Sequence, residues 1–73
     1  MAKEIVKCPM RCVIKKINVA VGDQVKEEDV LCIIEAMKME TPVVAPVSGK
    51  IVEVNVKEGQ SAKGGDPLFV IES

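Results

Sequence analysis

One lysine near the middle of the chain has the surroundings of a side chain that could be chemically modified. It lies between two methionines and two glutamates, in Glu35-Ala36-Met37-Lys38-Met39-Glu40. A lysine amine can form an amide with an activated carboxyl group, but a free lysine is mostly protonated at neutral pH. Chemistry at this amine would therefore need activation by another molecule.

The residues beside Lys38 are candidates for presenting it or for recognition by a modifying enzyme: Glu35, Ala36, Met37, Met39 and Glu40. The methionines are unbranched and adaptable, and they offer apolar contact without crowding the amine. As an alternative, one methionine packs against the domain and only the other is exposed. Glu35 is expected to be mainly structural or solvated, because a glutamate recurs at the equivalent position of an internal repeat. Glu40 has no such counterpart there and is the stronger recognition candidate.

The composition predicts one small all-β domain over residues 1–73. The apolar residues include 13 Val and 7 Ile but only 2 Leu and 1 Phe. β-Branched side chains suit the pleated, half-buried surface of a sheet. A chain this short buries little surface, so nearly all of it must contribute to one core.

Several functions are disfavoured by the composition. The net charge is −1 and Phe69 is the single aromatic residue, whereas proteins that bind single-stranded nucleic acid combine a basic groove with stacking aromatics. The longest apolar runs fall short of the roughly 18 residues of a membrane span. The first residues lack the apolar segment of a signal peptide. We expect no nucleic-acid partner, no direct membrane insertion and a cytoplasmic location.

The three cysteines are expected to be reduced thiols packed as small hydrophobic side chains: Cys8, Cys12 and Cys32. An odd number argues against a disulfide framework of the kind found in small secreted domains. A zinc site at Cys8 and Cys12 is an alternative, but the sequence has no His and would supply too few ligands. The sequence therefore predicts no metal.

The chain contains one structural unit twice. Residues 6–35 match residues 43–72 without a gap, and 11 of the 30 aligned positions are identical. Two such halves pack most simply about a pseudo-twofold axis. Lys38 falls between the copies. A shift by 37 residues in one direction leads from Lys38 to residue 1, and a shift in the other direction leads just past residue 73. The lysine turn and the termini should therefore lie on opposite edges of the domain.

Each copy predicts four short strands, separated by turns at Gly22 and Gly59. Pro42 should lie on an edge strand. In the long strand of each copy the apolar residues are spaced by three and then by two, which breaks strict alternation and predicts a β-bulge or sharp bend. The strands are expected at Ile5–Cys8, Cys12–Val19, Gln24–Lys26 and Val30–Glu35, and at Thr41–Val44, Gly49–Val56, Ser61–Lys63 and Pro67–Glu72.

Together, the repeat and the segment Ala36-Met37-Lys38-Met39 resemble the biotin carboxyl carrier domains of the biotinyl/lipoyl family. The resemblance implies a barrel-sandwich hybrid, a flattened β-barrel of two four-stranded antiparallel sheets with internal pseudo-twofold symmetry. It implies covalent biotin on Lys38, attached by biotin protein ligase. It also implies carboxyl transfer between a biotin carboxylase and a carboxyltransferase or decarboxylase subunit, with no catalysis by the carrier itself. The gapless repeat leaves no room for the inserted thumb of some carriers.

The family pattern is not matched everywhere, and two other functions stay open. Arg11-Cys12 stands where Pro-Gly is common, and Glu28 stands where the second copy has Gly65, and these departures concern local turns rather than the lysine site. One alternative is a lipoyl carrier, or a carrier that accepts both cofactors, although lipoyl domains usually carry Asp-Lys-Ala at this turn. The other is an unmodified structural hairpin module of the same fold.

Overall fold

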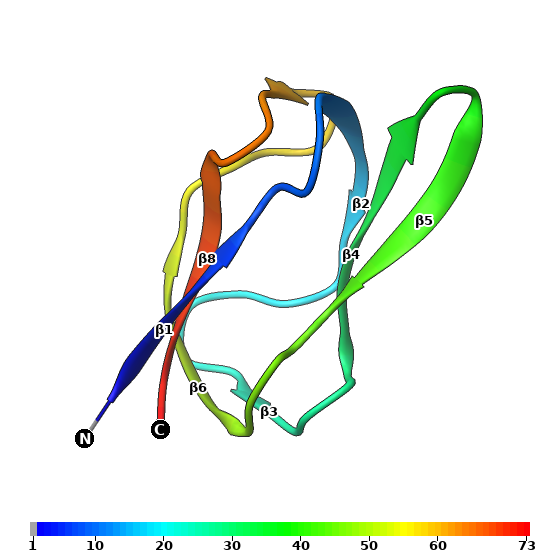
Figure 1. Cartoon of the computed structure of the whole chain (residues 1–73). Helices are drawn as coiled ribbons and strands as arrows, with labels where there is room; N and C mark the ends of the chain where they lie inside the picture. The colour runs from blue at the N-terminus through cyan, green and yellow to red at the C-terminus, as the bar shows by residue number, and fades with distance from the viewer. Residues whose placement is uncertain (1) are drawn as a thin grey trace.

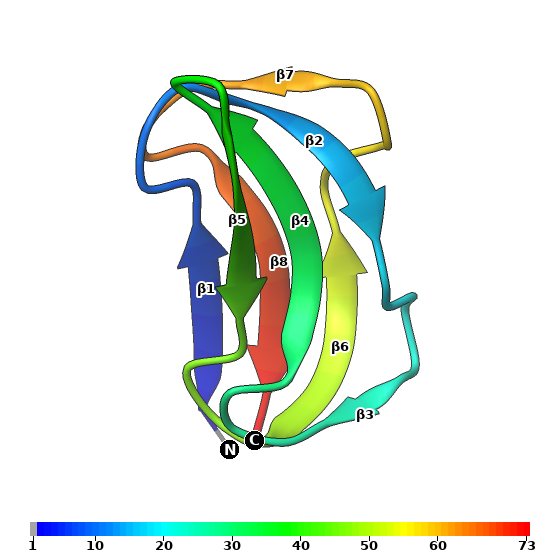
Figure 2. The ribbon, with the colours of Figure 1, turned by 90° about the vertical axis from the view of Figure 1, so that its right-hand side faces the viewer.

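A computed structural model describes residues 2–73 and shows eight β-strands in these residues. Two sheets of four strands lie one over the other, which confirms the expected all-β barrel-sandwich fold (Figure 2). All strand pairs are antiparallel. The strands are β1 (Lys3–Lys7), β2 (Cys12–Ile17), β3 (Gln24–Val25), β4 (Val30–Ala36), β5 (Met39–Val44), β6 (Gly49–Val54), β7 (Ser61–Ala62) and β8 (Pro67–Glu72).

The two copies of the repeat form one symmetric body. One sheet has the order β1-β8-β6-β3 and the other β5-β4-β2-β7, so a shift by one copy converts each sheet into the other. The backbone hydrogen bonds repeat in the same way. Asn18 N donates to Leu31 O, and Asn55 N donates to Leu68 O, both at 2.9 Å. Because each sheet takes strands from both copies, neither copy can complete a sheet alone.

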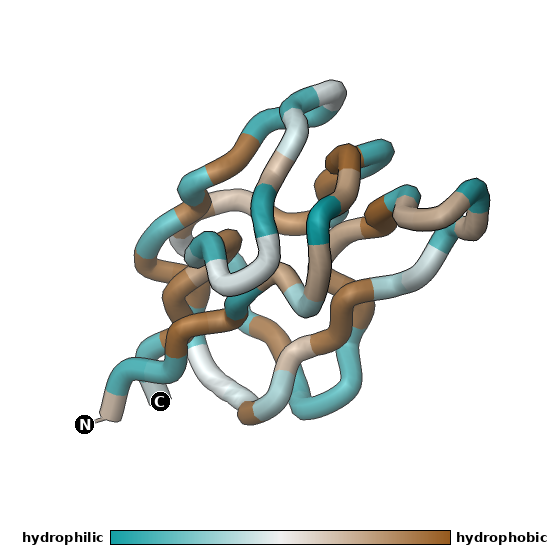
Figure 3. The backbone as a smooth tube through the Cα atoms, turned by 45° about the horizontal axis from the view of Figure 1, so that its top comes forward, coloured by the Kyte–Doolittle hydropathy of each residue, from teal (hydrophilic) through white to brown (hydrophobic). Residues whose placement is uncertain are grey.

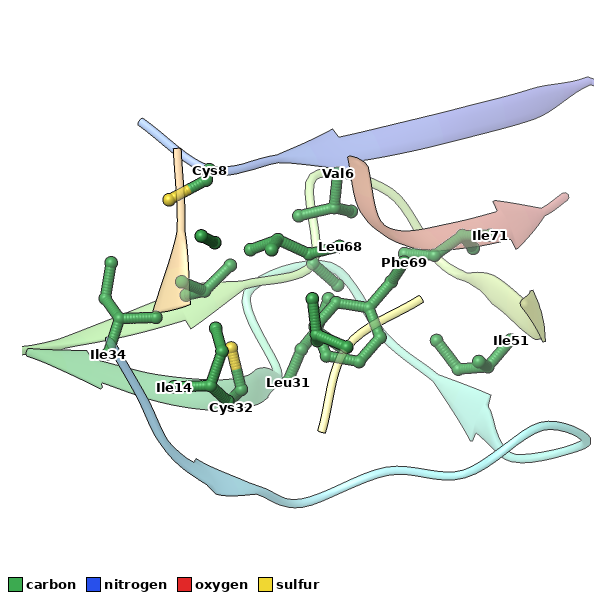
Figure 4. Close-up of a cluster of buried hydrophobic side chains, with 14 of the residues drawn as sticks. Val6, Cys8, Ile14, Leu31, Cys32, Ile34, Ile51, Leu68, Phe69 and Ile71 are labelled. Carbon is green, nitrogen blue, oxygen red and sulfur yellow. The ribbon is translucent and has the colours of Figure 1, made fainter. Parts of the chain in front are cut away.

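The core lies between the sheets and is apolar throughout the described residues. Phe69 occupies its middle, with residues from both copies around it (Figure 4). No polar or charged side chain among residues 2–73 is buried. The aligned pair Cys32 and Phe69 are both fully buried, as the repeat predicts. Figure 3 shows the complementary pattern, with hydrophilic segments concentrated at the outer turns.

The expected bends in the long strands are confirmed as β-bulges. The pairing of β2 with β4 shifts between Ile14 and Lys16, and the pairing of β6 with β8 shifts between Ile51 and Glu53. Each bulge lies within the three-residue step between apolar residues, from Ile14 to Ile17 and from Ile51 to Val54. The extra residue increases the local twist, which lets both strands curve around the shared core.

Several predicted strand ends were wrong by one to two residues. β1 begins at Lys3 rather than Ile5 because it pairs with β8 along its full length. β5 begins at Met39 rather than Thr41 because pairing starts directly after the lysine turn. β2 and β6 end at Ile17 and Val54, two residues early. β3, β7 and β4 differ from expectation by one residue at their ends, and β8 was predicted correctly.

The lysine turn and the chain termini lie at opposite ends of the molecule, as expected from the repeat. Figure 1 shows the β4–β5 hairpin projecting at one end and both termini together at the other. The longest dimension of the body is 36 Å. Ser73 N donates to Ala2 O at 2.9 Å, which ties the termini together. Within residues 2–73, no helix is long and apolar enough to cross a membrane.

The turn that lacks the family glycine keeps the same backbone conformation. Glu28 has a φ of 75°, and its counterpart Gly65 has a φ of 89°. Asp29 N donates to Lys26 O, as Asp66 N donates to Lys63 O. The departure from the family pattern therefore leaves the turn geometry intact, but it places a side chain in the left-handed region, which costs about 1–2 kcal/mol for a residue other than glycine.

Candidate functional site

Lys38 lies in the two-residue turn of a β-hairpin. β4 and β5 pair up to the last residue before the turn, with Ala36 opposite Met39 and Glu35 opposite Glu40. Met37 and Lys38 form the turn with φ values of 52° and 64°. Two central residues with positive φ are typical of a type I′ turn, whose twist matches that of the flanking strands. The sheet therefore holds the lysine at a defined position.

The sequence of this turn is unfavourable for its conformation. Type I′ turns strongly prefer Asn-Gly or similar pairs, because other residues are strained at positive φ. Met37 and Lys38 are both long side chains without a local hydrogen-bonding group that would ease this conformation. Backbone strain of this kind is commonly found at functional sites. We infer that Met37 and Lys38 serve the function of the site through their side chains, and that they do not stabilise the turn.

The side chains at the turn point into solvent. Met37 is 85% exposed and Met39 is 69% exposed, and Lys38 is exposed as well. The alternative in which one methionine packs against the domain is therefore wrong. Ala36 is half-buried against the core and anchors the hairpin to the body. Figure 3 shows the hairpin standing apart from the rest of the chain.

Glu35 is held by an ion pair across the sheet. Its Oε1 lies 3.4 Å from Nζ of Lys15, and both side chains are partly exposed. Such a surface pair contributes little to stability, but it restrains the carboxylate on the β2 side of the hairpin. The structural role expected for Glu35 agrees with this contact. Glu40 is exposed and makes no salt bridge within residues 2–73, so its carboxylate is accessible to a partner.

Two grooves in the described residues lie away from the lysine turn. A groove of about 340 Å³ lies between β1 and β5, and a larger one of about 880 Å³ lies near the C-terminus. Neither is lined by residues 36–40. The turn therefore offers an accessible amine between two exposed apolar side chains. The site fits amide formation with an activated carboxyl group, because nothing crowds the amine.

The three cysteines lie outside the hairpin turn itself, and all three are buried. All three are free thiols, as expected. Burial raises the pKa of Cys12 to about 12, with the hydrogen bond between the Cys12 and Cys8 thiols adding to the effect, and burial raises the pKa of Cys32 to about 11. Residues 2–73 contain no group of three or more side chains that could hold a metal ion.

Two features of the site were not predicted from the sequence. The first is the positive φ of Met37 and Lys38, because neither residue type signals it. The second is the contact of Lys15 with Glu35. A signal for that contact exists in the repeat, since Lys15 aligns with Val52 while Glu35 aligns with Glu72. The positive charge is therefore present only in the first copy, whose last strand, β4, leads into the lysine turn.

Comparisons with known proteins agree with this geometry. A family model described as "Biotin-requiring enzyme" matches residues 4–71. The chain is 41% identical over 70 residues to the biotin carboxyl carrier protein of Streptococcus mutans, covering 96% of this chain and 54% of that protein. It is 41% identical over 58 residues to a biotin/lipoyl attachment protein of Bacillus subtilis, covering 80% of each.

A solved structure shows the same fold. The crystal structure of urea carboxylase from Kluyveromyces lactis matches with a TM-score of 0.90 and 36% identity, over 99% of this chain and 6% of that one. The chain spans about half the length or less of the first curated relatives it matches. The family match covers nearly all of residues 1–73, and Lys38 lies within the matched range, at the hairpin turn between the two copies of the repeat. The chain therefore belongs to the family of biotin/lipoyl attachment domains described as biotin-requiring enzymes.

Proposed function

We propose that this chain is a biotin carboxyl carrier domain in which Lys38 bears covalent biotin. The observation that carries the proposal is the exposed lysine in a strained two-residue turn between two exposed methionines. When attached, biotin supplies the atom that holds a carboxyl group in transit. The protein's part is to fix the attachment point on a rigid hairpin and to keep it clear of the body. Relatives named as biotin carboxyl carrier proteins support the cofactor.

Attachment requires a partner that activates biotin. We propose that a biotin protein ligase supplies biotin with an activated carboxyl group, and that the amine of Lys38 displaces the activating group to form an amide. No salt bridge joins Lys38 to a carboxylate within residues 2–73, and the side chains of Met37, Lys38 and Met39 are exposed. Met37 and Met39 would give the ligase apolar contact, and Glu40 would give it an exposed carboxylate.

Carboxyl transfer requires two further active sites. We propose that the biotinylated hairpin visits a biotin carboxylase and then a carboxyltransferase or decarboxylase, either as subunits or as domains of one chain. The matched carboxylase structure contains this fold as 6% of its chain. When the carrier and the two active sites belong to one complex or one chain, the effective concentration of the cofactor at both active sites rises. In this account the domain is a non-catalytic carrier and acts in the cytoplasm.

A lipoyl carrier is the second candidate, since one relative is named for both cofactors. Incubation with biotin protein ligase, biotin and ATP should add one biotin, seen in the intact mass. A parallel incubation with lipoate ligase, lipoate and ATP should leave most of the protein unchanged. Efficient lipoylation without biotinylation would contradict the proposal and favour the alternative. Failure of both reactions would favour an unmodified structural module.

A further inference from the structure

Two buried thiols face each other at the end of the molecule that carries the hairpin. Sγ of Cys8 lies 2.8 Å from Sγ of Cys12, and the Cys8 thiol also donates to the carbonyl oxygen of Met10. The two side chains are 2% and 4% exposed. A disulfide bond is about 2.05 Å long, so a movement of under about 1 Å would join the sulfurs.

The sulfur pair belongs to one copy of the repeat only. Cys8 aligns with Ala45 and Cys12 aligns with Gly49. Ala45 is 1% exposed, so a methyl group fills the position of Cys8 in the second copy. At Gly49 an added Cβ would lie 2.5 Å from the carbonyl oxygen of Glu72, so that copy has no space for a side chain there. In the second copy, the fold forms at these two positions without a sulfur atom. Packing alone therefore gives no reason for two adjacent thiols in the first copy.

We propose that Cys8 and Cys12 form a reversible redox pair, which a hydroperoxide oxidises to an intramolecular disulfide. One thiolate attacks the peroxide, the O–O bond breaks, and a sulfenic acid forms. The second thiol then attacks the sulfenic sulfur, the S–S bond forms, and water leaves. With hydrogen peroxide, the two thiols lose two hydrogens and the oxidant is reduced to two waters. An external thiol reductant reverses the change.

The surroundings of the pair set how it reacts. A hydroperoxide is small enough to reach thiols that have almost no exposed surface. Burial raises the pKa of Cys12, so its thiolate is scarce at neutral pH, and oxidation should be slow and become faster as the pH rises. The bond would close the segment between β1 and β2, which includes the exposed Met10. This segment lies at the same end of the molecule as the β4–β5 hairpin (Figures 1 and 2). This pair does not depend on biotin at Lys38.

Peptide mapping tests the pair directly. The reduced protein is treated with hydrogen peroxide, quenched, denatured, alkylated with iodoacetamide and digested with trypsin. The number of alkylated cysteines should fall from three to one, at Cys32. Because Lys7, Arg11 and Lys15 are cleavage sites, peptides 8–11 and 12–15 should be recovered joined by a disulfide. Treatment with dithiothreitol should restore three alkylatable thiols.

Two variants serve as controls. Cys32→Ala should keep the link between peptides 8–11 and 12–15. Cys8→Ala, which installs the residue of the second copy, should abolish the link and leave two alkylatable thiols. Three alkylatable thiols in the wild-type protein after peroxide treatment would overturn the proposal. A link that includes Cys32, or oxidation of Cys8 or Cys12 that dithiothreitol does not reverse, would overturn it as well.

Discussion

At the scale of single residues, the non-glycine residues with positive φ fall into two groups. One group lies in a turn of the repeat, and the other lies at the lysine site. Glu28, Met37 and Lys38 all have positive φ without being glycine. Glu28 has a glycine at its repeat counterpart, Gly65, so nothing in the fold requires its side chain. Met37 and Lys38 lie in the segment that joins the copies, and the chemistry of the site depends on their side chains.

The first prediction concerns Glu28. Glu28→Gly should raise the free energy of unfolding by about 1 kcal/mol, because the left-handed backbone is strained for glutamate and relaxed for glycine. Urea unfolding of the two proteins measures the difference. Glu27→Gly is the matched control, since Glu27 has an ordinary φ and aligns with Gly64, and it should give no gain. Equal stabilisation by both substitutions would show that backbone strain is not the cause.

The second prediction concerns the buried thiols. Burial raises the pKa of Cys32 to about 11 and that of Cys12 to about 12, from a usual value of about 9. The fold therefore favours the protonated thiols. This contribution to stability is fully present below about pH 9 and is lost as the pH rises through 11 to 12. Between those limits the unfolded chain releases protons that the folded chain keeps, so the free energy of unfolding falls by up to about 1.4 kcal/mol per pH unit for each thiol.

Urea unfolding under reducing conditions between about pH 8 and pH 10.5 measures this slope. Cys32→Ala should lower the stability at every pH, because it removes core atoms, but it should also make the slope shallower. A slope that is the same with and without Cys32 would mean that other groups cause the pH dependence.

At the scale of elements, the sequence predicted the position of the β4–β5 hairpin but not the type of its turn. The repeat shows that the chain must reverse between residues 35 and 43, because equivalent strands lie on either side. The turn type could not be read from Met37 and Lys38, since type I′ turns are recognised by Asn-Gly pairs that are absent here. Pairing between the strands imposes the turn on residues that do not favour it. The bulges, in contrast, were visible in the spacing of Ile14 and Ile17.

The third prediction tests what Met37 contributes to the hairpin. Met37→Gly should stabilise the protein by about 0.5–1 kcal/mol, because glycine relieves the left-handed strain and loses part of that gain to the flexibility of the unfolded chain. Biotinylation should become slower, since the ligase loses an apolar contact. Thermal melting and a biotinylation time course on one sample measure both effects. Met39→Gly, within β5, should instead lower stability. Slower labelling together with lower stability of Met37→Gly would contradict the assignment of strain.

At the scale of the whole molecule, the repeat predicts the architecture but not the strand ends. Eleven identities across the repeat indicated two similar halves and an opposite placement of Lys38 and the termini. They could not show that β1 extends to Lys3, because that pairing depends on the last residues of the other half. The contact of Lys15 with Glu35 was missed for a similar reason, since it follows from the register of β2 against β4.

The fourth prediction concerns the dependence of the halves on each other. A fragment of residues 1–37 should be unfolded, because β1 pairs only with β8, and β2 and β4 lose β7 and β5. It would also lose Phe69 from the centre of the core. Circular dichroism and amide hydrogen exchange should show no stable strand in the fragment, and the full chain is the control. Protected amides in β2 and β4 of the fragment would show that one half folds by itself.

The central claim is that the hairpin presents a single lysine for biotin attachment, and mapping the label among the nine lysines of the chain tests it most directly. The wild-type protein, Lys38→Arg and the control Lys63→Arg, which changes an exposed lysine in another turn, are incubated with biotin protein ligase, biotin and ATP and then digested. The account predicts one biotin on Lys38 in the wild-type and Lys63→Arg proteins, and none in Lys38→Arg. Biotin that persists in folded Lys38→Arg, or labelling of the wild-type protein at another lysine, would contradict it.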